Sequence, residues 1–437
     1  MNIYPLKRIK FKKWILLFSI LSAFITFSKY VDAGGLACES LFNNYNFRIS
    51  LSSSWGTELI SPDHPTWKDP EYIKMITELA SPAITNYEGR AQYLYTSYKK
   101  LFNKLTNGET EPLAFTSNGT QANNLSIETL NDLARERFSQ DSNIKVEFLH
   151  FENMYGGSYG KSLELKRNEE TTIPSPYIII SDLNDKDKIN TTIQKEEEAI
   201  AFIEEKVSSK TIAISAIFIE PISASRIDGG LVRIVVYRQE FIDKLVSISK
   251  KYNIPIVADE ILTGGGRTGN FWGYQYYKNF EPELITFGKG IAISGLAVNY
   301  KSANKNLVYS IYNKIKLQYS GPTTEVNPLA LAQSYWVLKN IDELDLVSKA
   351  NENGKYFIAK AKEALDKQIS QSANPSRYDK VYIEGMGMLI SIKGIFKNSR
   401  FLKDHGFANR ILPPISLTKF QIDTIFYNES VLEFNPW

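Results

Sequence analysis

The pattern of hydrophobic and polar positions predicts alternating strands and helices in the middle of the chain. Residues 212–220, IAISAIFIE, form a near-continuous apolar run, which is typical of a strand covered on both faces. Apolar positions recur at helical spacing in residues 241–250, and two further buried strands are expected at residues 254–258 and 284–287. Strands that alternate with helices in this order indicate an α/β fold with a mostly parallel sheet.

The pattern extends less regularly to both sides of this region. We expect a helix after the turn at residues 118–119 and a short strand at residues 177–180, YIII. Residues 34 to about 100 show little periodicity and are rich in Ser, Pro and Tyr, so we expect an irregular segment there. A long helix over residues 329–363 and strands near residues 381–392 predict a second, smaller domain.

Composition excludes several classes of protein. The chain has 437 residues, of which 43% are hydrophobic and 23% charged, as in an ordinary folded protein with room for two domains. Its net charge is +3, and residues 1–33 account for +5 of it (six Lys and Arg against one Asp), which leaves −2 for the rest. This balance does not indicate a nucleic-acid partner. The single cysteine, Cys38, cannot form an intrachain disulfide, and the three histidines lack ligand-like spacing, so we expect no metal site.

The first 33 residues predict an export signal. A basic segment over residues 1–13 precedes an apolar run over residues 14–27, and that run is short for a bilayer span of roughly 20 residues. Val31-Asp32-Ala33 offers a cleavage site ahead of Gly34. We therefore expect an exported protein, periplasmic or secreted. The alternatives are a protein attached to a membrane through residues 14–27 and a hydrophobic N-terminal extension that is not a signal.

Three predicted strands end on side chains that can do chemistry. Glu220, Asp259 and Lys289 each follow a strand, and ligands of such sheets bind outside the carboxyl ends of the strands. A fourth element, residues 115–124 (FTSNGTQANN), places a glycine turn at the start of a helix. Backbone N–H groups at a helix N-terminus favour an anion, and Thr120 adds a hydroxyl.

A primary amine, a buried acid and an anion site together indicate pyridoxal 5′-phosphate. This cofactor needs an amine for a Schiff base, an acid beside its ring nitrogen and an anchor for its phosphate. Lys289, Asp259 and the 118–120 turn could supply them in that order. Interpretations without a cofactor remain open. A lysine at the end of a strand is commonly solvated, and an acid before glycines is commonly a turn residue. Glu260 could likewise be structural, and Arg267 could either bond its own loop or contact the substrate.

These motifs occur in an order that resembles the class III aminotransferases. ADEILTGGGRTG, residues 258–269, is followed by ITFGKGI, residues 285–291, and Asp259 and Lys289 are 30 positions apart. The similarity covers about residues 75–425. It implies fold type I of the pyridoxal phosphate enzymes, as in the ornithine, acetylornithine and GABA aminotransferases. That fold has a large domain with a mainly seven-stranded, mostly parallel sheet and a smaller α+β domain, and the resemblance implies a homodimer.

The resemblance also implies a role for each matching residue. Lys289 matches the catalytic Schiff-base lysine, and Asp259 matches the acid that holds the ring nitrogen protonated. Arg410 matches an arginine that binds a substrate carboxylate, a task that suits a bidentate guanidinium. The other cofactor-binding residues implied are Asn118, Gly119 and Thr120 at the phosphate, Tyr155 and Ile261 on the two ring faces, Glu220 near the ring, and Thr323 from the other subunit.

The chain departs from the family pattern beside the implied site. Leu262 stands where many members have a glutamine that bonds the cofactor's phenolic oxygen. Gly156 and Ser158 replace residues that are often His and Arg, and Ser225 stands where some relatives have an acid. These departures leave the substrate open and bring the retention of activity into question.

The resulting hypothesis is a pyridoxal phosphate-dependent transaminase that moves an amino group between an amino donor and a keto acid through the Lys289 Schiff base. Alternatives are another reaction on the same fold (aminomutase, racemase or decarboxylase) and an exported binding protein without catalysis. The expected organisation is a signal or anchor (1–33), an N-terminal segment with part of the small domain (34–104), a cofactor-binding large domain (105–330) and a C-terminal small domain (331–437).

Overall fold

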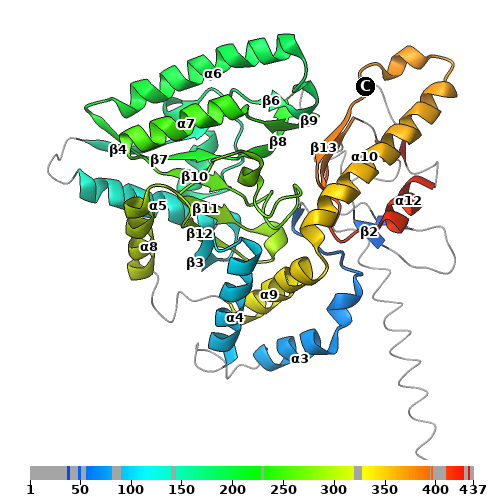
Figure 1. Ribbon diagram of the computed structural model, residues 1–437, viewed down its shortest axis with the longest axis horizontal. Helices are drawn as coiled ribbons and strands as arrows, with labels where there is room; N and C mark the ends of the chain where they lie inside the picture. Colours follow the sequence, from blue (N-terminus) through cyan, green and yellow to red (C-terminus); the bar gives the residue numbers. More distant parts are fainter. Residues whose placement is uncertain are drawn as a thin grey trace, which may run out of the picture.

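The computed structural model shows a large α/β body with a smaller lobe beside it (Figure 1). Residues 56–80, 90–138, 144–227, 231–318, 327–393 and 410–427 are described, together with the short stretches 37–39, 48–50, 395–396 and 432–433. Within these ranges no helix is both long and apolar enough to cross a membrane. Residues 1–33, on which the predicted export signal depends, lie outside the described residues.

The centre of the large body is a seven-stranded sheet in the order β3-β12-β11-β10-β7-β4-β5. Its strands are β3 (Thr110–Thr116), β4 (Lys145–Phe151), β5 (Thr172–Ile173), β7 (Ile212–Ile219), β10 (Ile256–Asp259), β11 (Leu284–Phe287) and β12 (Ser294–Asn299). The run from β11 through β10, β7 and β4 to β5 is parallel, and β12 is antiparallel to both of its neighbours. The predicted mostly parallel seven-stranded sheet is therefore confirmed.

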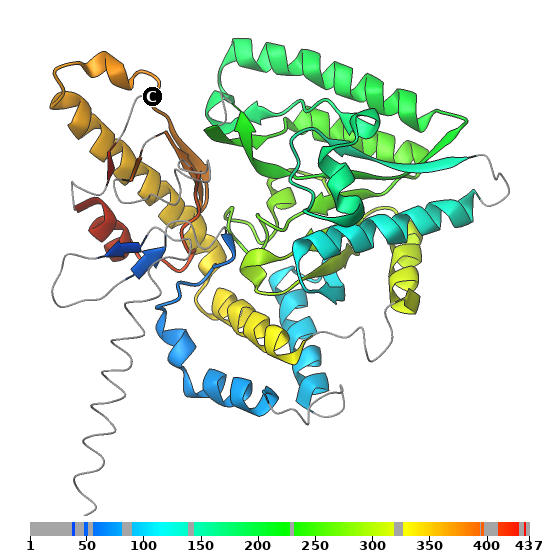
Figure 2. The ribbon, with the colours of Figure 1, turned by 180° about the vertical axis from the view of Figure 1, so that it is seen from behind.

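Helices cover both faces of this sheet, which explains the apolar strands. The helices α6 (Lys186–Val207) and α7 (Gln239–Tyr252) lie on one face, and α5 (Gly119–Arg137) lies on the other (Figures 1 and 2). The helix α8 (Lys305–Gln318) packs against α5 and the β3–β12 edge. Seven of the eight residues of β7 are buried, as its unbroken apolar pattern predicts.

The smaller lobe is built around an antiparallel sheet of β13 (Ile383–Met386), β14 (Leu389–Ile392) and β16 (Arg410–Ile411). The helix α10 (Leu346–Ser370) packs against β13, and α12 (Lys419–Tyr427) packs against α10. Residues near both ends of the chain meet here, because the Ser61 N–H donates to Ser416 Oγ (2.9 Å). The remaining short strands are β1 (Ala37–Glu39), β2 (Arg48–Ser50), β15 (Ile395–Phe396) and β17 (Leu432–Glu433).

A third sheet lies where the lobe meets the large body, and the sequence did not predict its hairpin. It consists of β6 (Ile178–Ile179), β8 (Ile222–Ile227) and β9 (Leu231–Val236). The strand predicted at residues 177–180 is thus present in part, but it belongs to this sheet. Both β13 and β14 contact β9, so this sheet connects the lobe to the large body.

The prediction of an irregular segment over residues 34 to about 100 is wrong for the described residues from 56 onwards. This stretch contains α3 (Pro70–Leu79) and most of α4 (Arg90–Leu105). Asp69 caps α3 by accepting from the Glu71 N–H, and Pro70 occupies the first helical position. The apolar stripe of α4, Leu94, Tyr98 and Phe102, repeats every four residues and is buried, but the Tyr and Lys around it obscure the period.

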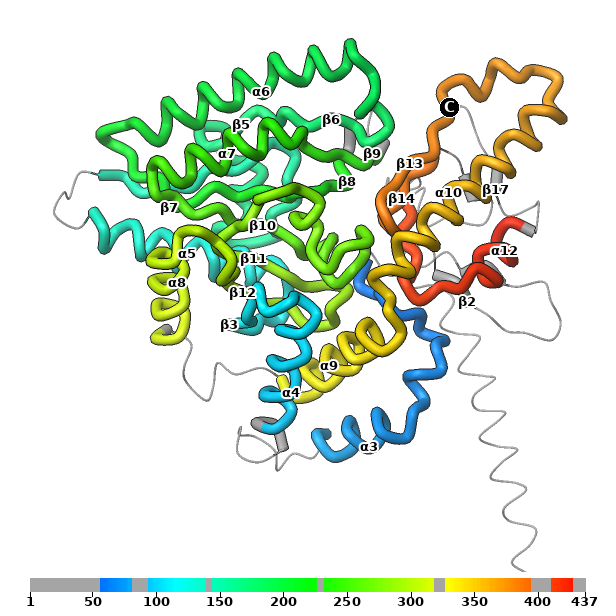
Figure 3. The backbone as a smooth tube through the Cα atoms, in the orientation of Figure 1, coloured from blue at the N-terminus to red at the C-terminus, as the bar shows by residue number. Residues whose placement is uncertain are grey.

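The single helix expected over residues 329–363 is two helices. They are α9 (Pro328–Glu343) and α10, and Figure 3 shows α9 leading directly into α10. Asp345 between them has φ 49° and ψ 49°, a left-handed conformation that a continuous helix does not allow. The proposed domain boundaries at residues 104 and 330 both fall inside helices, at the end of α4 and in the first turn of α9.

Candidate active site

Most of the predicted site residues line one cavity of about 1180 Å³. It lies at the carboxyl ends of β7, β10 and β11, which are neighbours in the sheet. Arg410 reaches it from β16 in the smaller lobe. Thr323 lies outside the described residues. The large body contributes Asn118, Gly119, Thr120, Tyr155, Glu220, Asp259, Ile261 and Lys289 to the wall.

Asp259 ends β10, and the residue is buried, with 7% of its surface exposed. Oδ2 accepts from Asn123 Nδ2 (2.8 Å), and Oδ1 accepts from the Ile261 N–H (3.1 Å). Burial raises the pKa of Asp259, whereas these hydrogen bonds and Lys289 act in the opposite direction. A cation brought against this carboxylate would keep it ionised, so its surroundings fit the protonated ring nitrogen of pyridoxal phosphate.

Glu220 follows β7 and is the second acid of the cavity. Oε1 accepts from the Tyr155 N–H (2.9 Å), and Oε2 accepts from Ser223 Oγ (2.5 Å). Burial, followed by the charge of Asp259, raises the pKa of Glu220 to about 7. Ser223 Oγ lies 2.9 Å from Ser225 Oγ, so Glu220 is connected to two hydroxyls of β8 that also face the cavity.

Lys289 stands on a one-turn 3₁₀ helix, η7 (Lys289–Ile291), directly after β11. Its φ of 42° lies in the left-handed region, which residues with a side chain rarely adopt. Burial, followed by the charge of Arg410, lowers the pKa of Lys289 to about 8, although Asp259 and Glu220 oppose the shift. An unprotonated amine is therefore accessible near neutral pH, as Schiff-base chemistry requires.

The N-terminus of α5 has the features expected of an anion site. Asn118 is the N-cap, and its Oδ1 accepts from the Gln121 N–H (3.0 Å). The first N–H groups of a helix have no partner within the helix, and those of Gly119 and Thr120 begin this one. A Cβ on Gly119 would lie 2.6 Å from Cδ1 of Ile261, so the helix end approaches the strand end closely. These features fit a phosphate group.

Tyr155 forms another wall of the cavity and is 62% exposed. Its hydroxyl lies 2.9 Å from Ser158 Oγ, and Nζ of Lys289 lies 5.9 Å from the centroid of its ring. The departure at Gly156 has a steric reason. Gly156 has φ 65°, and a Cβ there would lie 2.5 Å from Cβ of Leu165. A larger residue does not fit this backbone.

Two charged residues of the glycine-rich loop have structural contacts. Glu260 is fully buried and accepts from Thr263 Oγ1 and from the N–H groups of Gly273 (2.8 Å) and Tyr274 (2.7 Å). Burial raises the pKa of Glu260 to about 7. Arg267 is also fully buried and donates to backbone carbonyls, as described below.

The sequence did not single out several residues that complete the site. Asn123 bonds Asp259 directly and lies four positions after Gly119, on the same face of α5, so helical spacing alone could have identified it. Ser223, Glu58 and Lys166 line the cavity from segments far apart in sequence, and no local pattern marks them. Over the described parts of the chain, no cluster of three or more His, Cys, Asp and Glu could hold a metal.

Comparison with known proteins gives the same family as the motifs. The family model described as aminotransferase class-III matches residues 68–399. An alanine/serine racemase of Pyrococcus horikoshii is 27% identical over 271 residues, 56% of this chain and 52% of that protein. An acetylornithine aminotransferase of Lactococcus lactis subsp. lactis is 26% identical over 332 residues, 73% of this chain and 76% of that protein.

Several of these curated relatives, the racemase included, are matched over only about half of their own length. Among solved structures, a lysine aminotransferase from M. tuberculosis in the internal aldimine form superposes with a TM-score of 0.68 at 18% identity. The superposition covers 94% of this chain and 98% of that one. At this identity the similarity concerns the fold, which is that of the fold type I enzymes.

Proposed function

The chain belongs to the class III aminotransferase family, and from this membership we propose that it is a pyridoxal 5′-phosphate-dependent aminotransferase. The observation that carries the proposal is the meeting of Asp259, Glu220 and Lys289 at the ends of three adjacent parallel strands. The start of α5, which we propose as the phosphate site, lines the same cavity. The proposed reaction moves an amino group between an amino donor and a keto acid.

We assign the chemical steps of the proposed reaction to the cofactor and to Lys289. When bound, pyridoxal phosphate supplies an aldehyde that condenses with a primary amine and a ring that withdraws electrons from the adjacent carbon. Lys289 supplies the primary amine that would condense with this aldehyde. Its pKa of about 8 leaves part of the amine unprotonated near neutral pH. We assign to the same Nζ the removal of the proton from the substrate Cα, since a general base must be unprotonated.

The other side chains bind and orient. Asp259 would hold a proton on the ring nitrogen, and Asn123 fixes the carboxylate that does so. Gly119 and Thr120 would hold the phosphate, while Ile261 and Tyr155 would enclose the ring. Arg410 would bind the substrate carboxylate from the lobe side of the cavity.

A spectrum and a chemical trap test the cofactor and the lysine together. The purified protein should take up pyridoxal phosphate, absorb visible light and, after borohydride reduction, carry a pyridoxyl group on the peptide with Lys289. Lys289→Ala should lose the label, whereas Lys301→Ala, at an exposed lysine paired with Glu109, should keep it. A protein that takes up no cofactor would overturn the proposal and favour the binding protein without catalysis.

A racemase is the second candidate, and the alanine/serine racemase among the relatives is the observation that favours it. The two reactions differ in their need for a keto acid. A racemase interconverts the enantiomers of one amino acid without an acceptor, whereas an aminotransferase stops after one half-reaction until a keto acid is added. Chiral chromatography of the amino acid with and without a keto acid separates them.

We further propose a homodimer in which Thr323 completes the phosphate site of the other subunit. Membership of the class III aminotransferase family supports this proposal, since the resemblance to that family implies a homodimer. Co-expression of Lys289→Ala chains with Thr323→Ala chains tests this, because a mixed dimer then has one intact site. Activity should return to about a quarter of the wild-type value if the subunits mix at random. No recovery, with mixed dimers present, would overturn it.

Export by residues 1–33 is also a proposal, supported by the basic segment and the apolar run after it. Determining the N-terminal residue and the cell fraction of the protein isolated from intact cells distinguishes a cleaved signal from a membrane anchor. A chain beginning at Gly34 outside the inner membrane indicates cleavage. A chain that retains residues 14–27 in the membrane fraction indicates an anchor, and a full-length chain in the cytoplasm overturns both.

A further inference from the structure

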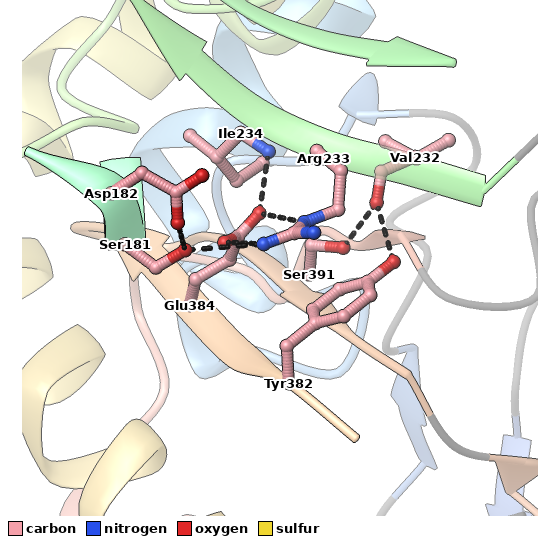
Figure 4. Close-up of polar contacts among 8 residues, drawn as sticks. All are labelled: Ser181, Asp182, Val232, Arg233, Ile234, Tyr382, Glu384 and Ser391. Atoms are coloured by element: carbon pink, nitrogen blue, oxygen red, sulfur yellow. Dashed lines mark hydrogen bonds and ion pairs between the residues drawn. The ribbon is translucent and has the colours of Figure 1, made fainter. Parts of the chain in front are cut away.

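A buried polar network joins the smaller lobe to the β8–β9 hairpin (Figure 4). Arg233 on β9 donates from Nε to Glu384 Oε1 (3.0 Å) and from Nη2 to Glu384 Oε2 (2.9 Å), which makes the ion pair bidentate. Glu384 Oε1 also accepts from the Ile234 N–H (2.9 Å). Arg233 and Glu384 are 8% and 4% exposed, so the pair is shielded from solvent.

Further contacts fix the orientation of this pair. Ser391 Oγ (2.6 Å) and the Tyr382 hydroxyl (3.1 Å) both donate to the carbonyl of Val232 (Figure 4). The guanidinium carbon of Arg233 lies 3.8 Å from the centroid of the Tyr382 ring, and Nη2 also donates to Ser181 Oγ (3.1 Å). The lobe and the hairpin are therefore held in one relative position by several directional contacts.

The pairing of residues between strands connects this network to the cavity both through the lobe sheet and through the β8–β9 hairpin. In the lobe sheet, Glu384 pairs with Ser391, and Ser391 pairs with Arg410, so the three form one row across β13, β14 and β16. In the hairpin, Arg233 pairs with Ser225. Residues paired directly in antiparallel strands share a face of the sheet. Arg410 and Ser225 line the cavity, and the ion pair therefore joins the two strand sets that carry them.

We propose that Arg233 and Glu384 are positioning residues that fix Arg410 against the β8 wall of the cavity and thereby set the affinity for a carboxylate substrate. The inference rests on the proposed function, in which Arg410 binds that carboxylate. Two-point binding by a guanidinium depends on geometry, and a displacement of about 1 Å can cost up to about a hundredfold. Neither residue belongs to the described wall of the cavity, so the effect falls on carboxylate binding rather than on proton transfer at Lys289.

Arg233→Lys and Glu384→Gln test the pair. A lysine at position 233 cannot make the bidentate contact of the guanidinium. A glutamine at position 384 keeps an acceptor for the Ile234 N–H but loses the negative charge. On the cofactor-loaded protein, the Kd of propionate, read from melting temperatures across a concentration series, should rise about tenfold. The KM of the keto acid should rise similarly with kcat within about twofold, which is the signature of lost uniform binding. The visible spectrum should not change.

A milder variant and a matched control keep the test decisive if those chains fold poorly. Ser391→Ala removes one hydrogen bond and should raise the propionate Kd by about threefold. Arg238→Lys is the control, since Arg238 pairs with Glu196 on α6 (3.1 Å) with side chains 17% and 2% exposed, on the face of the sheet that α6 and α7 cover. It should lose stability without changing the propionate Kd.

Arg410→Lys separates this inference from the proposed function. If Arg410→Lys leaves the propionate Kd unchanged, the carboxylate role of Arg410 is overturned and the positioning role falls with it. If Arg410→Lys weakens propionate binding while Arg233→Lys and Ser391→Ala behave like Arg238→Lys, only the positioning role is overturned. A raised Kd in both the Arg410 and the Arg233 variants supports both.

Discussion

Lys289 lowers the stability of the cofactor-free protein because its pKa of about 8 lies below the ordinary value of 10.5. Between these values the unfolded chain binds more protons than the folded one, so stability rises as pH rises through this window. Below pH 8 the full penalty is present, about 3 kcal/mol from the size of the shift. We therefore predict that Lys289→Met stabilises the cofactor-free protein by up to about 3 kcal/mol at pH 7 and by less than about 1 kcal/mol at pH 10.

Urea unfolding of both proteins at the two pH values measures this difference. Part of the gain is offset at pH 7, because Asp259 and Glu220 lose a positive neighbour. Lys301→Met serves as the comparison, since that side chain is 55% exposed. A gain at Lys289 that is the same at pH 7 and pH 10 would show that packing, not charge burial, is its cause.

Asn123 provides a second prediction at a single residue. Its Nδ2 donates to Asp259 Oδ2 and also to the carbonyl of Gly156 (2.5 Å), so it connects the acid to the Tyr155 segment. Asn123→Ala removes a hydrogen bond that lowers the pKa of Asp259. We expect the affinity for pyridoxal phosphate to fall about tenfold, in line with the strength of hydrogen bonds to a charged group.

Fluorescence titration with the cofactor measures this affinity. Asn131→Ala is the matched control, because Asn131 is a buried asparagine on the same helix that accepts from Ser215 Oγ (2.6 Å) away from the cavity. Equal affinities in the two variants would mean that Asn123 acts only on the stability of α5.

At this scale the sequence identified residues that stand at the ends of regular elements and missed those that do not. Glu220, Asp259 and Lys289 follow strands whose apolar runs are unmistakable, so their convergence followed from sheet geometry. Ser223, which the sequence did not single out, and Ser225, which it noted only as a departure from the family pattern, both lie on β8, a six-residue strand of the β8–β9 hairpin. Their connection to Glu220 depends on how that hairpin folds back, which no local spacing encodes.

Among the elements, the start of α5 depends most closely on one glycine. A Cβ at position 119 would lie 2.6 Å from Cδ1 and 3.0 Å from Cγ2 of Ile261, closer than atoms pack. We predict that Gly119→Ala moves the helix end away from the strand end and weakens cofactor binding about tenfold, since a 1 Å displacement of an anion site is costly.

The double variant Gly119→Ala/Ile261→Val provides the rescue. Valine lacks Cδ1, the atom with the shortest approach, so cofactor affinity should recover in part. Ile261→Val alone controls for the lost ring contact. If the double variant binds no better than Gly119→Ala, the steric explanation is wrong and the N–H groups themselves are disturbed.

Element prediction succeeded where burial produces a clean pattern. The strands β7, β10 and β11 are buried on both faces and were placed within two residues of their ends. The helix α4 was missed because Tyr and Lys interrupt its apolar stripe, and the break between α9 and α10 was missed because the left-handed Asp345 leaves the helical period intact on both sides. The left-handed backbone conformation of Asp345 alone separates the two helices.

At the scale of the whole molecule, the cavity exists only where distant segments meet. Its wall includes Glu58 near the N-terminal end of the described chain, Lys289 after β11 and Arg410 in the lobe. Arg267 holds these parts together. Its guanidinium is fully buried and donates to the carbonyls of four residues in three segments, Gly56 (3.3 Å), Glu58 (3.1 Å), Met388 (3.4 Å) and Pro413 (3.0 Å).

We therefore predict that Arg267→Met lowers the free energy of unfolding by about 3 kcal/mol, since it strips buried carbonyls of their donor. Burial, followed by the charge of Arg410, lowers the pKa of Arg267 to about 10, in line with the cost of burying a charged group. Arg135→Met, at an exposed arginine paired with Asp132, should cost less than about 1 kcal/mol. Guanidinium chloride unfolding compares the two.

The kcat and KM of Arg267→Met distinguish this structural role of Arg267 from the substrate contact that the sequence left open. If Arg267 acts by joining the segments, the variant at a temperature well below its melting point should keep its kcat, and any rise in KM should vanish as folding is restored by excess cofactor. If Arg267 contacts the substrate, KM should rise under every condition while stability stays that of the wild type. Since the guanidinium already donates to carbonyls of three separate segments, the first result is expected.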